Sequence, residues 1–316
     1  MAYRPEEMAN FESVQRLFGK VSDGSKKVFA IGLAHYANYM GSDPDTIIDD
    51  RKRTWRDGLI QLDEDIKRIH EEKFSGFAAY LKGLTPPLSS NSVKTYMSAA
   101  SAFYGRNFYP LIKPEIPAAH NIRILHTPTL QEMGVLLTTV DDDPLKMGAM
   151  AAAFQSGQSA SDLLALRWDS QSPQFGTVKE QLERGIVHIH ATRVKSGVEY
   201  DSFLGHLTVS ILKRDDYQKT DPLVFPLSVR KLELIFQKAS RKAKLVGVTS
   251  PHAARRFFTT QLKMAGFNES LVESWTAHAL TGVRGSYFKP SPEAQLQEYK
   301  RAERFLTPPQ YQEVLS

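Results

Sequence analysis

The sequence predicts a mainly α-helical protein with a small antiparallel β-sheet, divided into two domains. Apolar residues recur at three- and four-residue spacing along most of the chain, which is typical of amphipathic helices. One short region instead alternates apolar and polar residues, as strands do, and a proline-rich stretch separates two regions that are each periodic. A chain of 316 residues is long enough for two domains with separate cores.

The first domain is expected to be helical from about residue 10 to residue 110. Helical spacing is present in KKVFAIGLAHYANYM and EKFSGFAAYLKGL; turn residues interrupt it in LTPPLSSNS, and it resumes in VKTYMSAASAFYGRNF. The following stretch, PLIKPEIPAAHNIRILHTPT, contains four prolines and little periodicity. We therefore assign residues 1–120 to the first domain, 121–128 to a linker and 129–316 to the second domain.

The second domain is expected to begin with a helix capped by Thr129, followed by helices in DDDPLKMGAMAAAFQSG and SASDLLALRW. The stretch RGIVHIHATRVKSGVEYDSFL predicts two strands joined by a turn at Ser196 and Gly197. Helices follow in VRKLELIFQKASRKAKL, HAARRFF and ESLVESWTAHAL. A last amphipathic segment, EAQLQEYKRAERFL, predicts a tail helix that could dock on a neighbouring subunit.

Bulk composition is ordinary for a globular protein, with 41% hydrophobic and 24% charged residues. The net charge of +5 permits nucleic-acid binding without requiring it. The absence of cysteine excludes disulfides and thiolate metal sites, and the sequence contains neither a P-loop nor a metal-ligand cluster. Without an apolar run of membrane length or a signal peptide, we expect a cytoplasmic protein that does not enter a membrane.

The stretch SPHAARRFF carries the first sign of chemistry. Ser250 and Pro251 suit the N-cap and first position of a helix, and His252 and Arg255 then share one face beside the unpaired N–H groups of its first turn. Cations at the positive pole of a helix dipole repel one another, and a bound anion such as phosphate would resolve this conflict. Alone, however, such a pair is often ordinary surface charge.

Other residues lie at informative positions relative to this pair. His278 lies 23 residues after Arg255, Tyr287 lies nine residues further on, and Lys195 lies at the predicted strand turn. This ordered set resembles the tyrosine recombinase (phage-integrase) family of mobile elements, over most of residues 129–290. The resemblance implies a two-domain DNA clamp, with a helical core-binding domain at 1–120 and a catalytic domain at 129–316.

The resemblance also implies site-specific DNA recombination or integration. Tyr287 would attack a DNA phosphodiester to give a 3′-phosphotyrosyl intermediate, and Lys195 would protonate the leaving 5′-oxygen. His252 and Arg255 would hold the non-bridging oxygens, with His278 assisting. The chemistry needs no cofactor and no metal. The partner would be double-stranded DNA, with four subunits on paired sites and a monomer possible in the free state.

One position departs from the family pattern. Its first box reads roughly T-G-x-R-x-S-E-L-x-x-L, and the matching stretch here is SGQSASDLLALRW, in which Ser159 occupies the arginine position. Serine has neither the charge nor the fork of a guanidinium, so the sequence predicts weak or absent cleavage. The substitution could be engineered, the branch could be naturally degenerate, or another arginine could fill the gap. The candidates for this arginine are Arg256, Arg193 and Arg284, while Ala277 replaces the usual glycine before His278.

A basic helix face gives a further prediction. Lys231, Lys238 and Lys242 fall on one side of the expected helix 229–245, opposite its apolar residues, and we expect them to contact the DNA backbone, although a simple solvated face has the same pattern. Two other functions remain open: a DNA-binding protein of the same fold that has lost catalysis, and a type IB topoisomerase-like nicking enzyme that acts without synapsis.

Overall fold

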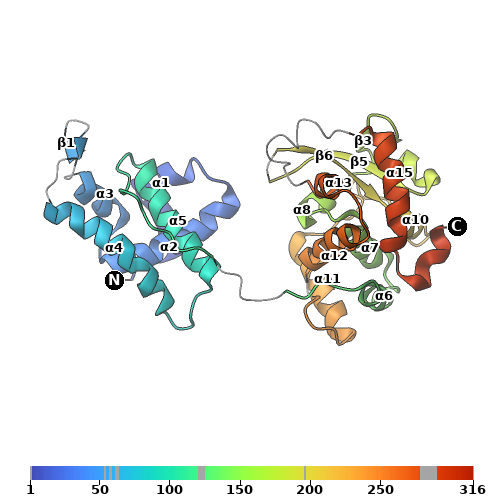
Figure 1. Cartoon of the computed structure of the whole chain (residues 1–316), viewed down its shortest axis with the longest axis horizontal. Helices are drawn as coiled ribbons and strands as arrows, with labels where there is room; N and C mark the ends of the chain where they lie inside the picture. The colour runs from blue at the N-terminus through green and yellow to red at the C-terminus, as the bar shows by residue number, and fades with distance from the viewer. Residues whose placement is uncertain are drawn as a thin grey trace. The chain divides into compact units, whose positions relative to one another are not determined.

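The chain folds into two compact units, Met1–Ile124 and Leu125–Ser316 (Figure 1). The structure is a computed structural model, and it describes residues 2–52, 55–56, 59–60, 64–119, 125–195, 197–248, 250–277 and 290–315. The fold class is confirmed, because the described residues are mostly helical and their strands form small antiparallel ladders.

The first unit is a helical bundle in which α2 packs along α5. Both helices begin at a serine N-cap, Ser22 and Ser89, whose side chains accept a hydrogen bond from the first turn. A short hairpin, β1–β2, separates α3 from α4. The sequence did not predict it, because two-residue strands are too short to produce a periodic pattern. The elements are η1 (Pro5–Asn10), α1 (Glu12–Phe18), α2 (Asp23–Met40), α3 (Pro44–Lys52), β1 (Trp55–Arg56), β2 (Leu59–Ile60), α4 (Glu64–Lys82) and α5 (Ser90–Arg106).

A polar cluster lies inside the core of this bundle. The Tyr36 hydroxyl and the Nδ1 atom of His70 each lie 2.9 Å from the hydroxyl of Tyr104, and all three side chains are buried. Burial, assisted by the charge of Arg51, lowers the pKa of His70 to about 4. The imidazole is therefore neutral at physiological pH.

The second unit is built around α7, a central helix in which every residue from Met147 to Ser156 is buried. Its alanine-rich sequence lets α10, α11, α12 and β6 pack closely around it. The helices of this unit are α6 (Leu130–Thr138), α7 (Pro144–Ser156), α8 (Ala160–Leu164), α9 (Val178–Gln181), η2 (Leu182–Arg184), α10 (His206–Leu212), α11 (Val229–Lys242), α12 (Pro251–Met264), α13 (Glu269–Trp275), α15 (Pro292–Ala302), η3 (Glu303–Phe305) and η4 (Pro309–Leu315).

The predicted hairpin is present as β5 (Val187–Thr192) and β6 (Glu199–Leu204). The two strands are antiparallel, with Val187 opposite Leu204 and Thr192 opposite Glu199. The turn was predicted at Ser196 and Gly197, and Ser196 lies outside the described residues. A second ladder of two-residue strands, β3 (Gln171–Ser172) and β4 (Gly176–Thr177), was not predicted. Among its described residues, the second unit thus holds two small sheets where the sequence predicted one.

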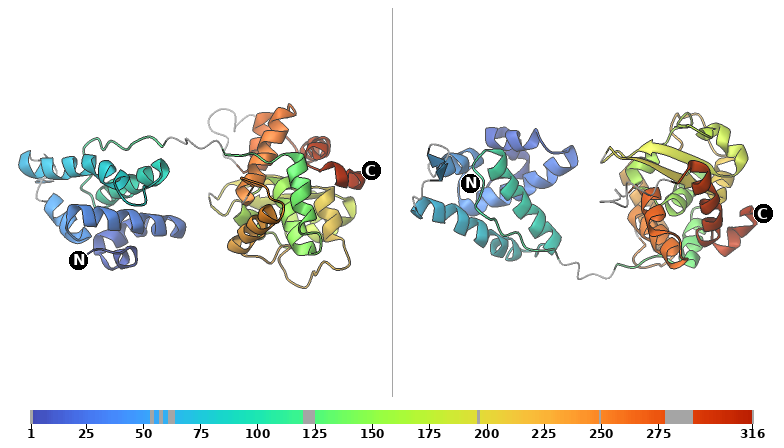
Figure 2. Two further views of the ribbon diagram at one scale, coloured as in Figure 1. Left: turned by 90° about the horizontal axis from the view of Figure 1, so that it is seen from below. Right: turned by 45° about the horizontal axis from the view of Figure 1, so that its top comes forward.

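The C-terminal tail packs on its own unit (Figure 2). The Tyr299 ring of α15 is fully buried, stacks on Phe203 at 4.8 Å between centroids, and donates its hydroxyl hydrogen to the carbonyl of Gln155 at 2.8 Å. The Trp275 indole N–H donates to the Gln295 side chain at 3.0 Å. In this structure the core of its own unit covers the apolar face of this helix, and docking on a neighbouring subunit stays a prediction. None of the described helices has the length and apolarity needed to cross a membrane.

Candidate functional site

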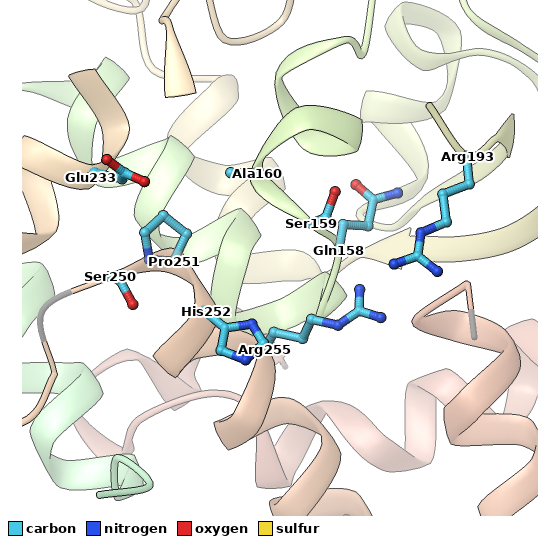
Figure 3. A pocket seen from close by; sticks show the side chains of 9 residues that line it. All are labelled: Gln158, Ser159, Ala160, Arg193, Glu233, Ser250, Pro251, His252 and Arg255. Atoms are coloured by element: carbon cyan, nitrogen blue, oxygen red, sulfur yellow. The ribbon is translucent and has the colours of Figure 1, made fainter. Parts of the chain in front are cut away.

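The start of α12 forms one wall of a pocket of about 370 Å³ (Figure 3). Pro251 occupies the first helical turn as predicted, but the Ser250 side chain makes no capping hydrogen bond. His252 is exposed and Arg255 is buried, and both face the pocket, as their three-residue spacing predicted. The lining residues are Gln158, Ser159, Ala160, Arg193, Glu233, Ser250, Pro251, His252 and Arg255.

Arg255 is fixed by backbone carbonyls on two segments. Its guanidinium donates to Gly157 at 3.0 Å and also to Thr276. Gly157 has φ +62°, and a Cβ atom there would lie 2.5 Å from the Phe258 ring, so the position requires glycine. Burial, and then the neighbouring charge of Arg193, lower the pKa of Arg255 from its ordinary value. An arginine nevertheless stays protonated in proteins, so this pocket wall carries a fixed positive charge.

Ser159, at the position where the family pattern has arginine, is the N-cap of the short helix α8. Its hydroxyl accepts a hydrogen bond from the backbone N–H of Asp162 at 3.3 Å and donates to a carboxylate oxygen of Asp162 at 2.6 Å. The serine therefore has a structural role of its own, which the comparison with the family pattern did not reveal.

Asp162 connects α8 to the turn between β5 and β6. Its carboxylate is almost fully buried and accepts a hydrogen bond from the backbone N–H of Val194 at 2.9 Å. Its other oxygen lies 4.0 Å from the Nε atom of Arg193. Lys195 follows in the same turn with an exposed side chain, and it is not among the residues that line the pocket. Its predicted role as proton donor stays a prediction.

Arg193 is the turn residue whose side chain enters the pocket. Its guanidinium donates to the carbonyl of Ala277 at 2.7 Å, directly beside the Thr276 carbonyl that Arg255 contacts. In Figure 3 the two guanidinium groups end near one another at one side of the pocket, and Glu233 lies at the other side. Arg256, the neighbouring candidate, instead points away from the pocket and donates to the carbonyl of His126 at 2.8 Å.

Ala277 lies where the family pattern has glycine, and its φ of +54° explains that preference. The left-handed region costs an alanine roughly 1 kcal/mol, whereas glycine enters it freely. The two carbonyls held by Arg255 and Arg193 therefore belong to a tight turn at the end of α13. This turn leads directly into the predicted His278.

Three predicted residues, His278, Arg284 and Tyr287, lie outside the described residues. The described residues end at Ala277 and begin again at Pro290. The roles predicted for these three residues accordingly stay predictions. Among the described residues, no cluster of His, Asp and Glu could hold a metal ion.

The basic face of α11 is present as predicted. Lys231, Lys238 and Lys242 are exposed, while Leu232 and Phe236 on the opposite side are fully buried. The three lysines line one groove of about 450 Å³. Lys146 of α7 completes this groove. It was missed because it lies on another helix, far away in the sequence.

Comparison with known proteins shows what this architecture is similar to. No protein-family model matches the sequence, and a search of curated proteins finds no match. Solved structures do match. The XerH site-specific recombinase, in a post-cleavage complex with a palindromic difH substrate, superposes with a TM-score of 0.59 at 17% identity, over 94% of this chain and 89% of that one.

Two integrase structures give similar results. A lambda integrase dimer bound to a COC′ core site matches with a TM-score of 0.54 at 15% identity, over 90% of this chain and 98% of that one. The integrase of the Tn1549 transposon, in complex with circular intermediate DNA, matches with a TM-score of 0.50 at 15% identity, over 92% and 98% of the two chains. The chain therefore has the tyrosine recombinase fold.

Proposed function

We propose that this protein is a site-specific DNA recombinase or integrase that cleaves DNA by tyrosine attack. The observation that carries the proposal is the pocket at the start of α12, where Arg255 and His252 meet a second guanidinium beside the segment that leads to His278 and Tyr287. A pocket lined by two guanidinium groups suits a phosphodiester.

In the proposed reaction, the Tyr287 hydroxyl gives up its proton to solvent as its oxygen forms a bond to the phosphorus of a DNA phosphodiester. The bond from that phosphorus to the 5′-oxygen breaks, and Lys195 gives this oxygen a proton. The products are a 3′-phosphotyrosyl link and a free 5′-hydroxyl. Arg255 and His252 hold the non-bridging oxygens, with His278 assisting, and the charge that develops on these oxygens is what the pocket stabilises.

The DNA would be held by both units of the chain. Residues 1–120 would form the core-binding domain and residues 129–316 the catalytic domain, joined by the linker at 121–128. The lysines of α11 would contact phosphates along the backbone without reading sequence. The similarity in fold to XerH and lambda integrase, both solved on DNA, supports double-stranded DNA as the partner. Four subunits on two paired sites would complete the recombination complex.

The test is a search for a covalent protein–DNA adduct. Nicked, end-labelled duplexes covering the DNA that flanks the gene would be incubated with the protein and resolved under denaturing conditions. We expect an adduct in which the protein is joined to the 3′-phosphate end of the cleaved strand, and we expect Tyr287→Phe to abolish it. Tyr311→Phe is the matched control, because Tyr311 lies on η4 and does not line the pocket.

A second function, DNA binding without cleavage, is favoured by one observation, the serine at position 159. Sequence-specific binding to the same duplexes without any adduct would support this function. Adduct formation that survives Tyr287→Phe would instead show that another residue is the nucleophile.

A further inference from the structure

We propose that Arg193 is the second phosphate-binding arginine of this pocket, supplied by the β5–β6 turn in place of an arginine at position 159. The inference rests on the proposed function for its substrate, a phosphodiester. It follows that the active site is complete although position 159 is a serine, and that the protein cleaves DNA without any substitution.

The position of Arg193 is the first argument. Its side chain and that of Ser159 line the same pocket, so a guanidinium from the turn reaches the space that a long side chain at position 159 would enter. Arg193 and Arg255 also donate to consecutive carbonyls, those of Ala277 and Thr276. One tight turn therefore fixes both guanidinium groups and holds them beside the same space.

Unused hydrogen-bonding capacity is the second argument. The Nε atom of Arg193 is buried and, within the described ranges, has no hydrogen-bond partner; the nearest Asp162 oxygen is 4.0 Å away. Gln158 also lines the pocket. Its side-chain oxygen, as assigned, is buried and has no hydrogen-bond partner among the described residues. The nitrogen of that amide contacts the Tyr200 hydroxyl at 3.0 Å. A hydroxyl can donate as well as accept, so turning the amide by 180° would present its N–H groups to the pocket.

Charge is the third argument. Two guanidinium groups near one another repel, and Asp162 is the carboxylate closest to Arg193. Its oxygens are already engaged by the Val194 N–H and the Ser159 hydroxyl. Glu233 lies at the opposite side of the pocket and pairs with Arg230 at 3.2 Å. An oxyanion in the pocket between Arg193 and Arg255 would offset the repulsion between the two guanidinium groups.

The hydrogen bonds around position 159 also explain why serine suits this position. The serine caps α8 and binds Asp162, and Asp162 in turn holds the backbone of the turn that carries Arg193. Ser159 thus acts as a positioning residue for Arg193. An arginine at position 159 would lose this cap and would add a third guanidinium to a pocket of about 370 Å³.

The first experiment measures the rate of covalent attachment in four proteins: unsubstituted, Arg193→Gln, Ser159→Arg and the double variant Ser159→Arg/Arg193→Gln. We expect Arg193→Gln to lower the rate by about 10²–10³-fold while leaving DNA affinity nearly unchanged, because a transition-state donor is lost. We expect no gain from Ser159→Arg alone and a partial recovery in the double variant. Arg256→Gln is the matched control, since this arginine points out of the pocket.

The outcomes separate this inference from the proposed function. Normal attachment by Arg193→Gln would overturn the inference and leave the function standing. A large gain from Ser159→Arg alone would also overturn it, because the pocket would then have been lacking a guanidinium. An absence of attachment in every variant would count against the proposed function, and the second experiment then decides whether Arg193 binds an oxyanion.

The second experiment needs neither DNA cleavage nor a variant that folds. Inorganic phosphate is titrated into the unsubstituted protein at constant ionic strength, and the Nε–H signals of the arginines are followed by NMR. We expect the Arg193 and Arg255 signals to shift together in a saturable manner, and the Arg256 signal to stay unchanged. A saturable shift of Arg255 without Arg193, or no saturable shift of either, would overturn the inference.

Discussion

At the scale of single residues, the candidate site divides into positions that the sequence identified and one that it left open. His252 and Arg255 were identified because their pairing is local, within one helical turn. Arg193 remained one of three candidates. Its contact with Ala277 spans 84 residues and depends on how the β5–β6 turn meets the end of α13. Local periodicity in the sequence does not predict such a long-range contact.

Ser159 illustrates a second limit at the same scale. Compared with the family pattern, Ser159 lacks the positive charge of an arginine, whereas its hydrogen bonds identify it as an N-cap. Both descriptions are true of the residue. Only the arrangement of the neighbouring turn indicates where the missing charge is supplied.

His70 gives a prediction about pH. Its pKa is lowered to about 4 in the folded state, against about 6.5 in an unfolded chain, so between these values the unfolded state binds more protons. Folding stability of the first unit is therefore fully present above about pH 6.5 and is lost as the pH falls towards 4. The loss should amount to roughly 2–3 kcal/mol.

The measurement is urea unfolding followed by far-UV circular dichroism at a series of pH values. His70→Gln is the informative variant, because an amide can still contact the Tyr104 hydroxyl but does not titrate. We expect this variant to lose the part of the pH dependence between 4 and 6.5. Parallel curves for the two proteins would show that His70 is not responsible.

At the scale of elements, long helices were predicted well and short elements were not. The helix α11 has a strong apolar face, and its lysines lie opposite that face as expected. The ladders β1–β2 and β3–β4 and the helix α10 were missed, because each is too short or too buried to produce a periodic pattern. The tail helix α15 was predicted as an element, and its apolar face packs on its own unit here, while docking on a neighbouring subunit stays a prediction. An apolar face does not specify which surface covers it.

The lysine face of α11 makes a prediction about salt. Removing one lysine that neutralises a phosphate should reduce the slope of log affinity against log salt by about 0.9, so Lys231→Gln/Lys238→Gln/Lys242→Gln should reduce it by up to about 3. The slope is measured by fluorescence anisotropy with a labelled duplex. The matched control replaces Lys179, Lys219 and Lys300, which are equally exposed but lie away from this groove. Equal slopes for the two triple variants would make the α11 face an ordinary solvated surface.

At the scale of the whole molecule, the fold was predictable because the helical periodicity and the proline-rich break indicate the same organisation of the chain. Helical periodicity fills both halves of the chain, and one proline-rich stretch interrupts it. The division of the chain into two compact units falls between residues 124 and 125, within the segment that the sequence assigned to a linker. Each unit has its own buried core. Residues from the first unit line none of the pockets discussed above.

This organisation predicts where a protease cuts first. The Pro110 carbonyl accepts a hydrogen bond from Arg51, and the Ile112 N–H donates to Glu71, so the chain is held to the first unit up to this point. From residue 113 to 119 the described chain has neither helix nor strand. We therefore expect early cleavage between residues 113 and 126. Trypsin should cut after Arg123, since Pro114 blocks cleavage after Lys113, and Glu-C protease should cut after Glu115.

Specific DNA should suppress these cuts if both units bind one duplex, because the linker would then cross the DNA and lose access to the protease. The cleavage sites are identified by mass spectrometry of the fragments, with and without a saturating duplex. A random duplex at the same concentration is the control for nonspecific protection. Early cleavage within α11, after Arg230 or Lys231, would contradict the division of the chain. Unchanged linker cleavage in the presence of specifically bound DNA would mean that the two units do not enclose the duplex.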